Sequence, residues 1–276
     1  MANLKIAFAP QVEPSAVPAT APFAMVNYGC RITHRESAFA MSTLTAVVDD
    51  LVAANRILAG LGVLDGFGHV SVRHPDRADC YLLARSLAPE LVTRDDIMTF
   101  DMASAPQNRD TRTPYLERFI HGEVFAQRPD VISVVHSHAA TVVPFAASSV
   151  PLKPIYHMSS FLRTGAPVFE IREKFGMTDM LIRNNAQGAA LAEKLGDNSA
   201  VLMRGHGYCT VGGSIPEAVF RAYYAQLNAD LQQRAVALGG TVTYLEDEEA
   251  RRYDETNRSV IGRPWGLWKA KFAPKD

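Results

Sequence analysis

Two histidines, His136 and His138, follow the apolar run 131–135 and are separated by a single residue. Side chains two residues apart on a strand point to the same face, so both imidazoles should converge at one strand end. Two converging imidazoles form half of a transition-metal site. A single histidine here would more often be an ordinary polar residue at a strand terminus, and it is the pair that favours metal binding.

Two further residues could complete such a site. His206 ends a second apolar segment, 200–206, and is flanked by glycines that let the backbone turn sharply or approach a ligand closely. Glu117 lies in an amphipathic segment, 114–123, that we expect to form a helix leading into the strand of the histidine pair. Three imidazoles and one carboxylate suit zinc, manganese, iron or cobalt, and an incompletely filled coordination sphere would leave room for a substrate.

The order of these residues resembles the class II aldolase/adducin family, whose metal site contains a His-x-His pair, a later His and an upstream Glu that acts as ligand or as acid/base. Residues 68–73 also resemble its Gly-Asn-x-Ser element, and the similarity extends from about residue 40 to residue 240. It implies a three-layer α/β/α sandwich around a mixed, largely antiparallel sheet, and a homotetramer with active sites at subunit interfaces. The metal ligands would be His136, His138, His206 and Glu117, with manganese or zinc bound and iron or cobalt as alternatives.

The chain departs from the aldolases at the positions that bind a phosphate group. His69 replaces an Asn, Ser86-Leu87 replaces a Thr-Gly pair, and Tyr115-Leu116 replaces a Ser-Ser pair. Leucine removes the close backbone approach that glycine provides, so the sequence argues against a phosphorylated sugar. His69 and Ser86 would contact a different substrate.

Three more side chains are candidates for binding or protonating that substrate. Arg85 could hold a carboxylate with its guanidinium group or form a surface salt bridge. His121, one helical turn after Glu117, could hydrogen-bond the acid, approach the substrate or pack at the helix–sheet boundary. His157 stands where the aldolases carry a proton-donating tyrosine, and an imidazole can also deliver a proton.

These departures resemble a decarboxylase branch of the family that acts on 3-hydroxy-2-methylpyridine-4,5-dicarboxylate and on hydroxyphthalates. The resemblance implies a divalent-metal-dependent decarboxylase of a hydroxylated aromatic or pyridine carboxylate or dicarboxylate, a carbon–carbon lyase of aromatic compound catabolism. The metal would chelate the ring hydroxyl and adjacent carboxylate and stabilise the carbanionic intermediate, and Glu117 or His157 would then protonate the ring. One alternative is a class II aldolase or epimerase that acts on a sugar or sugar phosphate through an enediolate. Another is a non-catalytic, adducin-like role, which lost ligands would favour.

Composition narrows the possible partners. The chain has 276 residues, 47% of them hydrophobic, and a formal net charge of −1 without a Lys/Arg cluster, which argues against nucleic acid or membrane surfaces. No apolar run reaches the roughly 20 residues needed to cross a bilayer. Three widely spaced cysteines, at positions 30, 80 and 209, indicate a reducing compartment. We therefore expect a cytoplasmic enzyme without a signal peptide, and the family resemblance implies that its partner is a small hydroxyaryl carboxylate.

The patterning also predicts the elements that position these residues. Residues 1–36, with four prolines, should form an extended arm, and 37–276 should form one catalytic domain. Helical spacing predicts helices at 42–61, 115–127, 179–195 and 215–238, and another from Ala139. Short apolar runs predict strands at 67–73, 80–84, 97–101, 131–138 and 200–206. The C-terminal aromatic residues should be buried on the core or in an oligomer interface.

Overall fold

The computed structural model describes the backbone of residues 35–273 and the side chains of residues 43–273. The arm expected over 1–36 lies outside this range, apart from its last two residues, which already belong to the first helix, α1 (Arg35–Gly60). Cys30 also lies outside it, whereas Cys80 and Cys209 are buried free thiols. Among the described residues, no helix is both long and apolar enough to cross a membrane.

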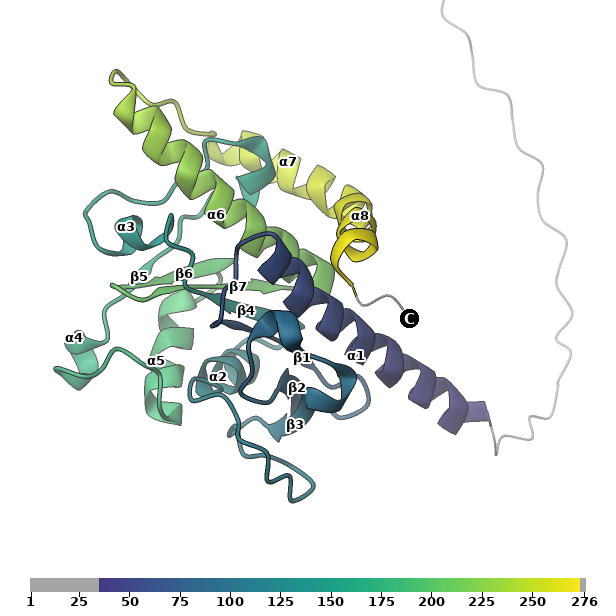
Figure 1. Cartoon of the computed structure of the whole chain (residues 1–276). Helices are drawn as coiled ribbons and strands as arrows, with labels where there is room; N and C mark the ends of the chain where they lie inside the picture. Colours follow the sequence, from purple (N-terminus) through teal and green to yellow (C-terminus); the bar gives the residue numbers. More distant parts are fainter. Residues whose placement is uncertain (1–34, 274–276) are drawn as a thin grey trace, which may run out of the picture.

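A single mixed sheet forms the centre of the fold (Figure 1). Its order is β3-β2-β1-β4-β7-β6-β5, and every neighbouring pair is antiparallel except β5 and β6. The strands are β1 (His69–Arg73), β2 (Cys80–Ala84), β3 (Ile97–Asp101), β4 (Ser133–Ser137), β5 (Val168–Phe169), β6 (Ala200–Met203) and β7 (Gly207–Gly212). The predicted mixed, largely antiparallel sheet is therefore confirmed.

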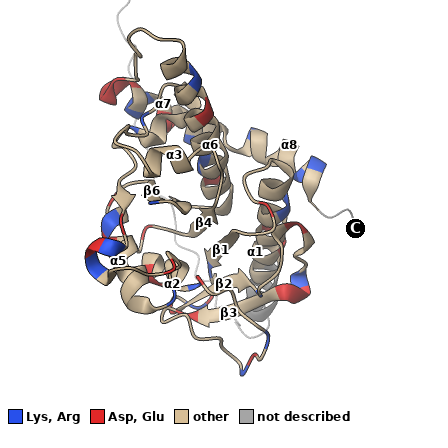
Figure 2. Cartoon of the chain, turned by 60° about the vertical axis from the view of Figure 1, so that its left-hand side comes forward, with Lys and Arg blue, Asp and Glu red and all other residues tan. Residues whose placement is uncertain are grey.

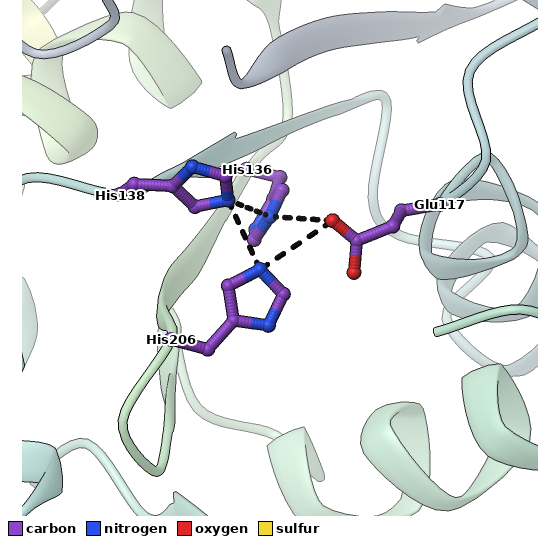
Figure 3. Close-up of side chains that lie close together, drawn as sticks. All are labelled: Glu117, His136, His138 and His206. Carbon is purple, nitrogen blue, oxygen red and sulfur yellow. Dashed lines mark hydrogen bonds and ion pairs between the residues drawn. The ribbon is translucent and has the colours of Figure 1, made fainter. Parts of the chain in front are cut away.

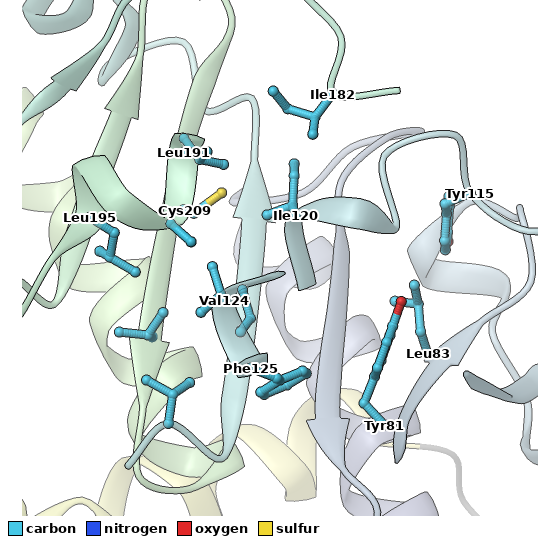
Figure 4. Packing of buried hydrophobic residues seen from close by; sticks show 14 of the residues in the cluster. Tyr81, Leu83, Tyr115, Ile120, Val124, Phe125, Ile182, Leu191, Leu195 and Cys209 are labelled. Atoms are coloured by element: carbon cyan, nitrogen blue, oxygen red, sulfur yellow. The ribbon is translucent and has the colours of Figure 1, made fainter. Parts of the chain in front are cut away.

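Helices cover both faces of the sheet, as the α/β/α prediction requires. On one face, α1, α6 (Ile215–Ala237) and α8 (Gly262–Phe272) pack against Val70, Val72 and Val135. On the other face, α2 (Phe119–Gln127) and α5 (Asn185–Leu195) pack against Val134 and other strand residues (Figure 4). Because Val134 and Val135 belong to opposite faces, β4 alternates as a strand between two buried layers should, and His136 lies on the face of α2 and α5.

Further elements connect these layers or extend them. They are the 3-10 helices η1 (Pro89–Leu91), η2 (Arg94–Asp96) and η3 (His157–Leu162), and the α-helices α3 (Val143–Ala146), α4 (Arg172–Phe175) and α7 (Asp247–Val260). Basic and acidic residues are interspersed along the outer helices (Figure 2). The C-terminal aromatic residues pack on their own chain: Trp268 is buried, its ring 5.5 Å from that of Tyr223, and Phe272 lies against Gly60.

Several predicted boundaries differ from the structure. The helix expected from residue 115 begins only at Phe119, so Glu117 lies in the turn before α2. The helix expected from residue 179 begins at Asn185, where the Asn184 side chain accepts a hydrogen bond from the backbone of Gln187 and caps the first turn. The prediction missed β5, which has two residues, and β7, whose glycines at both ends resemble a loop.

Candidate active site

The three histidines of the predicted site come from adjacent strand ends. His136 lies near the end of β4 and His138 immediately follows it, while His206 lies in the tight turn between β6 and β7. Because β7 pairs with both β4 and β6, this turn lies beside the end of β4. Gly207 makes that approach possible, since a Cβ atom there would lie 2.2 Å from the Ser137 carbonyl oxygen.

Glu117 joins the histidines from the turn that precedes α2 (Figure 3). The Nε2 atom of His138 is 3.0 Å from the Nε2 atoms of both His136 and His206. The Glu117 Oε2 atom is 3.5 Å from His136 Nε2 and 3.4 Å from His206 Nε2. One donor atom from each of the four residues therefore lies within 4.8 Å of all the others.

Backbone groups orient three of these side chains. His136 Nδ1 is 3.2 Å from the Tyr208 carbonyl oxygen, and His206 Nδ1 is 3.1 Å from that of Met180. A carbonyl oxygen only accepts hydrogen bonds, so we assign the proton of each ring to Nδ1, which leaves the Nε2 lone pairs directed at the cluster. The Ile182 backbone N–H donates to Glu117 Oε1 at 3.0 Å, which leaves Oε2 for the cluster.

The electrostatics of the cluster suit a cation. Burial and the neighbouring His136 and His206 lower the pKa of His138 to about 4, so its imidazole is neutral at pH 7. Burial disfavours the charged form of Glu117, but hydrogen bonds and the charges of His136 and His206 outweigh it and hold the carboxyl pKa well below its usual range. Although burial opposes it, the contact with Glu117 raises the pKa of His206. A divalent ion displaces such protons when it binds, and three imidazole nitrogens that converge beside an ionised carboxylate are the donor set of a divalent transition metal.

A cavity of about 500 Å³ opens beside this cluster and reaches Glu117 and His138. Ligand pockets of roughly 300–1,000 Å³ are typical of small-molecule sites. The walls combine a few polar groups with apolar side chains, and they are formed by Gly66, Phe67, Gly68, His69, Ser86, Leu87, Ala88, Tyr115, Leu116, Glu117, His138 and Leu181. Two of the expected substrate-binding residues, His69 and Ser86, thus lie at the cavity.

His121 does not hydrogen-bond Glu117. The predicted pairing needed both residues on one face of a helix, but Glu117 lies in the turn before α2. Instead, His121 Nε2 is 2.6 Å from His69 Nδ1, and His121 Nδ1 is 2.5 Å from Ser71 Oγ. All three side chains are buried, and burial lowers the pKa of His121 to about 3 and that of His69 well below its usual value. Both rings are therefore neutral at pH 7.

The direction of the hydrogen bonds in this chain follows from Ser71. Its hydroxyl is buried and, among the described residues, has only His121 Nδ1 as a partner, so it must donate its proton to avoid an unsatisfied O–H group. His121 then donates from Nε2 to His69 Nδ1, and His69 carries its proton on Nε2. We conclude that His69 offers a neutral N–H donor at the cavity.

Arg85 forms the salt bridge that was one of its two interpretations. Its Nε atom lies 2.6 Å from Asp96 Oδ1, and Asp96 is fixed in turn by hydrogen bonds from the backbone and side chain of Thr93. Arg85 does not line the cavity, although Ser86, the next residue, does. In this chain the carboxylate partner of Arg85 is Asp96, and its contact with a substrate carboxylate remains a prediction.

His157 also lies apart from the cluster. It is exposed at the start of η3, with its ring 4.5 Å from that of Tyr253, and it lines a separate surface depression with residues of α7. Within one chain the structure does not bring this imidazole to the cavity beside Glu117. A role in protonation remains a prediction.

Sequence reasoning missed several residues of the site. Ser71 lies two positions after His69 on β1, and this spacing could have placed both side chains on one face. Met180, Leu181 and Ile182 hold His206 and Glu117 or line the cavity, but two of these three residues act through the backbone, which has no signature in the sequence.

Comparison with known proteins finds matches to both the sequence and the fold. Residues 49–233 match the family model described as "Class II Aldolase and Adducin N-terminal domain". The chain is 36% identical to "Decarboxylase tropJ" of Talaromyces stipitatus over 91% of this chain and 94% of that protein. It is 32% identical to the "3,4-dihydroxyphthalate decarboxylase" of Terrabacter sp. over 76% of this chain and 90% of the relative.

A solved structure supports the same assignment at the level of the fold. The aldolase II superfamily protein from Pseudomonas syringae superposes with a TM-score of 0.69 at 21% identity, covering 83% of this chain and 92% of that one. The family model covers well over half of the chain, and the predicted resemblance, including its decarboxylase relatives, is confirmed. The chain belongs to the class II aldolase/adducin family.

Proposed function

We propose that this protein is a divalent-metal-dependent decarboxylase of a hydroxylated aromatic or pyridine carboxylate. The observation that carries the proposal is the cluster of three imidazoles and one carboxylate at the wall of a cavity with apolar side chains. Two relatives named as decarboxylases support it, one of them a dihydroxyphthalate decarboxylase. Decarboxylases and aldolases are both carbon–carbon lyases, so the family also supports this class of enzyme.

His136, His138, His206 and Glu117 would hold manganese or zinc, with iron or cobalt as alternatives. A divalent ion there would supply Lewis-acid stabilisation of negative charge that develops on the substrate oxygens. The hydrogen bonds from Nδ1 of His136 and His206 to carbonyl oxygens would keep these ligands correctly oriented.

His69 and Ser86 are the proposed contacts to the substrate. The His69 Nε2–H group is a neutral donor at the cavity, and it would bind an oxygen of the hydroxyl or carboxylate group. Because the His69 ring is held by His121, which Ser71 holds in turn, little rotational freedom would be lost on binding. Ser86 is exposed, lines the same cavity and offers a hydroxyl group.

Glu117 is the proposed group for proton transfer. The ionised carboxylate would accept the proton of the ring hydroxyl, the bond between the ring and the carboxylate carbon would break, and carbon dioxide would leave. The electron pair left on the ring carbon would then take the proton from Glu117, directly or through water. One proton from solvent would restore the hydroxyl group, so the net reaction consumes one proton for each carbon dioxide released.

His157 would reach a cavity only if a second copy of the chain supplied it, because it lies apart from the site of its own chain. This arrangement agrees with the proposed homotetramer with active sites at subunit interfaces. His157→Ala would then lower turnover without changing the metal content. Full turnover in that variant would leave Glu117 as the proposed proton donor.

The role of Glu117 is tested by Glu117→Gln, with Glu123→Gln on the adjoining helix as the matched control. We expect Glu117→Gln to bind substrate but to lose turnover by about 100-fold or more, whereas Glu123→Gln keeps it. Substrate affinity from calorimetry, metal content and steady-state kinetics should be measured on the same preparations. Normal turnover by metal-loaded Glu117→Gln would remove Glu117 from the mechanism.

A further inference from the structure

The walls of the active-site cavity indicate which carboxylates the protein accepts. We infer that its substrate is a hydroxyarene with one carboxylate and an apolar substituent, rather than a phthalate-type dicarboxylate. This inference rests on the proposed decarboxylase function and narrows its substrate class. It also sets the chain apart from the relative named for 3,4-dihydroxyphthalate, which carries two carboxylates.

The first observation is the charge of the cavity wall. Among the described residues, Glu117 is its only charged side chain apart from titratable histidines, and no Lys or Arg lines it. Arg85 is adjacent in sequence to the wall, but its Nε atom is paired with Asp96 at 2.6 Å. A second carboxylate in this cavity would therefore meet no cationic side chain of the chain.

Charge balance explains why the absence of a Lys or Arg side chain from the cavity wall limits the substrates that can bind. A divalent ion held by Glu117 and neutral histidines has one net positive charge, which a single carboxylate of the substrate neutralises. A second carboxylate would add an unpaired negative charge and would lose hydration against apolar walls, which is strongly unfavourable. The same argument applies to a phosphate group, so it also opposes the sugar-phosphate alternative.

The second observation is that large apolar side chains are exposed at the cavity. Phe67 and Leu116 are 68% and 56% exposed, and both line it together with Leu87 and Leu181. The Phe67 ring centroid is 6.3 Å from that of His138, so this apolar surface adjoins the cluster. Exposed apolar groups that gather at a cavity typically mark a binding surface. Here they would cover the ring of the substrate and an alkyl group on it.

The matched substrates for the test are 2,3-dihydroxy-6-methylbenzoate, its 6-propyl analogue and 3,4-dihydroxyphthalate, in which a carboxylate replaces the methyl group. Carbon dioxide release by the purified, manganese-loaded full chain gives kcat/KM for each. We expect the methyl compound to exceed the phthalate at least tenfold, and each added methylene group to raise kcat/KM by up to about fourfold.

Leu116→Arg supplies the missing cation. We expect it to raise the ratio of phthalate to methyl-compound kcat/KM by about tenfold. Leu116→Met tests whether side-chain length alone changes that ratio. Leu91→Arg places the same charge on η1, outside the cavity, at a residue that is 61% exposed.

The outcomes separate this inference from the function on which it rests. A preference for the phthalate by the unaltered protein would overturn the inference but leave the decarboxylase function intact. An equal change of the ratio in Leu116→Arg and either control would also overturn it. Release from none of the three substrates, together with release from a pyridine dicarboxylate, would refute the inference alone, and no release from any carboxylate would refute the function.

Discussion

The buried His121 should make the stability of the fold sensitive to acid. The ring is fully buried, and its pKa is lowered from 6.5 to about 3, chiefly because burial disfavours the charged form. The unfolded chain therefore binds a proton near pH 6.5 that the folded chain does not. Stability from this group is complete above pH 6.5 and is lost as the pH falls towards 3, since protonation favours the unfolded state.

The magnitude follows from proton linkage. Each pH unit below the unfolded pKa changes the free energy of unfolding by about 1.4 kcal/mol for one group. Between pH 6.5 and pH 4.5, His121 should thus remove about 2 kcal/mol. His121→Gln eliminates this titration but keeps both hydrogen bonds, because the amide oxygen can accept from Ser71 and the amide nitrogen can donate to His69.

Urea unfolding followed by circular dichroism provides the measurement, with metal-free protein at one concentration. We expect His121→Gln to be less stable than the unaltered protein at pH 7.5, and the difference to shrink by about 2 kcal/mol between pH 6.5 and 4.5. His157→Gln, which changes an exposed histidine, should run parallel to the unaltered protein. Parallel curves for His121→Gln as well would refute the assignment of a buried, neutral His121.

Three further results are expected. Gly207→Ala should lower metal content and destabilise the fold by about 2 kcal/mol or more, because its Cβ would lie 2.2 Å from the Ser137 carbonyl oxygen. Gly262→Ala is the control, because a Cβ at Gly262 would have no atom within 4 Å. Equal effects of the two substitutions would contradict the steric argument. Ser71→Ala should release the His69 ring and so raise KM about tenfold with a smaller change in kcat. In the same variant, 15N NMR should show a mixture of His69 tautomers. An unchanged tautomer would contradict the assigned hydrogen-bond direction. Manganese at 100 times its Kd should stabilise the metal-free protein by about 2.7 kcal/mol. The stabilisation should appear as a rise in Tm that is absent in His138→Ala. An equal rise in Tm in that variant would mean that the ion binds elsewhere.

Much of the fold could be predicted from the sequence because its elements have regular apolar patterns. The prediction placed β2 and β3 at their observed bounds and ended the long helix α6 within one residue of Ala237. It missed β7, whose terminal glycines interrupt the apolar pattern and which forms a buried strand by pairing with β4 and β6. Tertiary pairing rather than local preference determines such a strand.

The histidines of the candidate metal site could be predicted because each follows an apolar strand pattern, whereas the surroundings of the site could not be predicted. His69 and His121 are 52 residues apart, and only packing of α2 on the sheet brings their rings together. The backbone atoms of Met180 and Ile182 that orient His206 and Glu117 leave no trace in residue type. The salt bridge between Arg85 and Asp96 could not be predicted from the sequence, because it depends on the hydrogen bonds from Thr93 that position the Asp96 carboxylate.

The proposed function is the decarboxylation of hydroxyaryl carboxylates at the cluster of one Glu and three His residues. The most direct measurement is carbon dioxide release from hydroxylated benzene and pyridine carboxylates by manganese-loaded protein, chelator-treated protein and His138→Ala. Release that requires both the metal and His138 is the predicted result. Release that survives chelation and His138→Ala, or cleavage of sugar phosphates without release from any carboxylate, would contradict it.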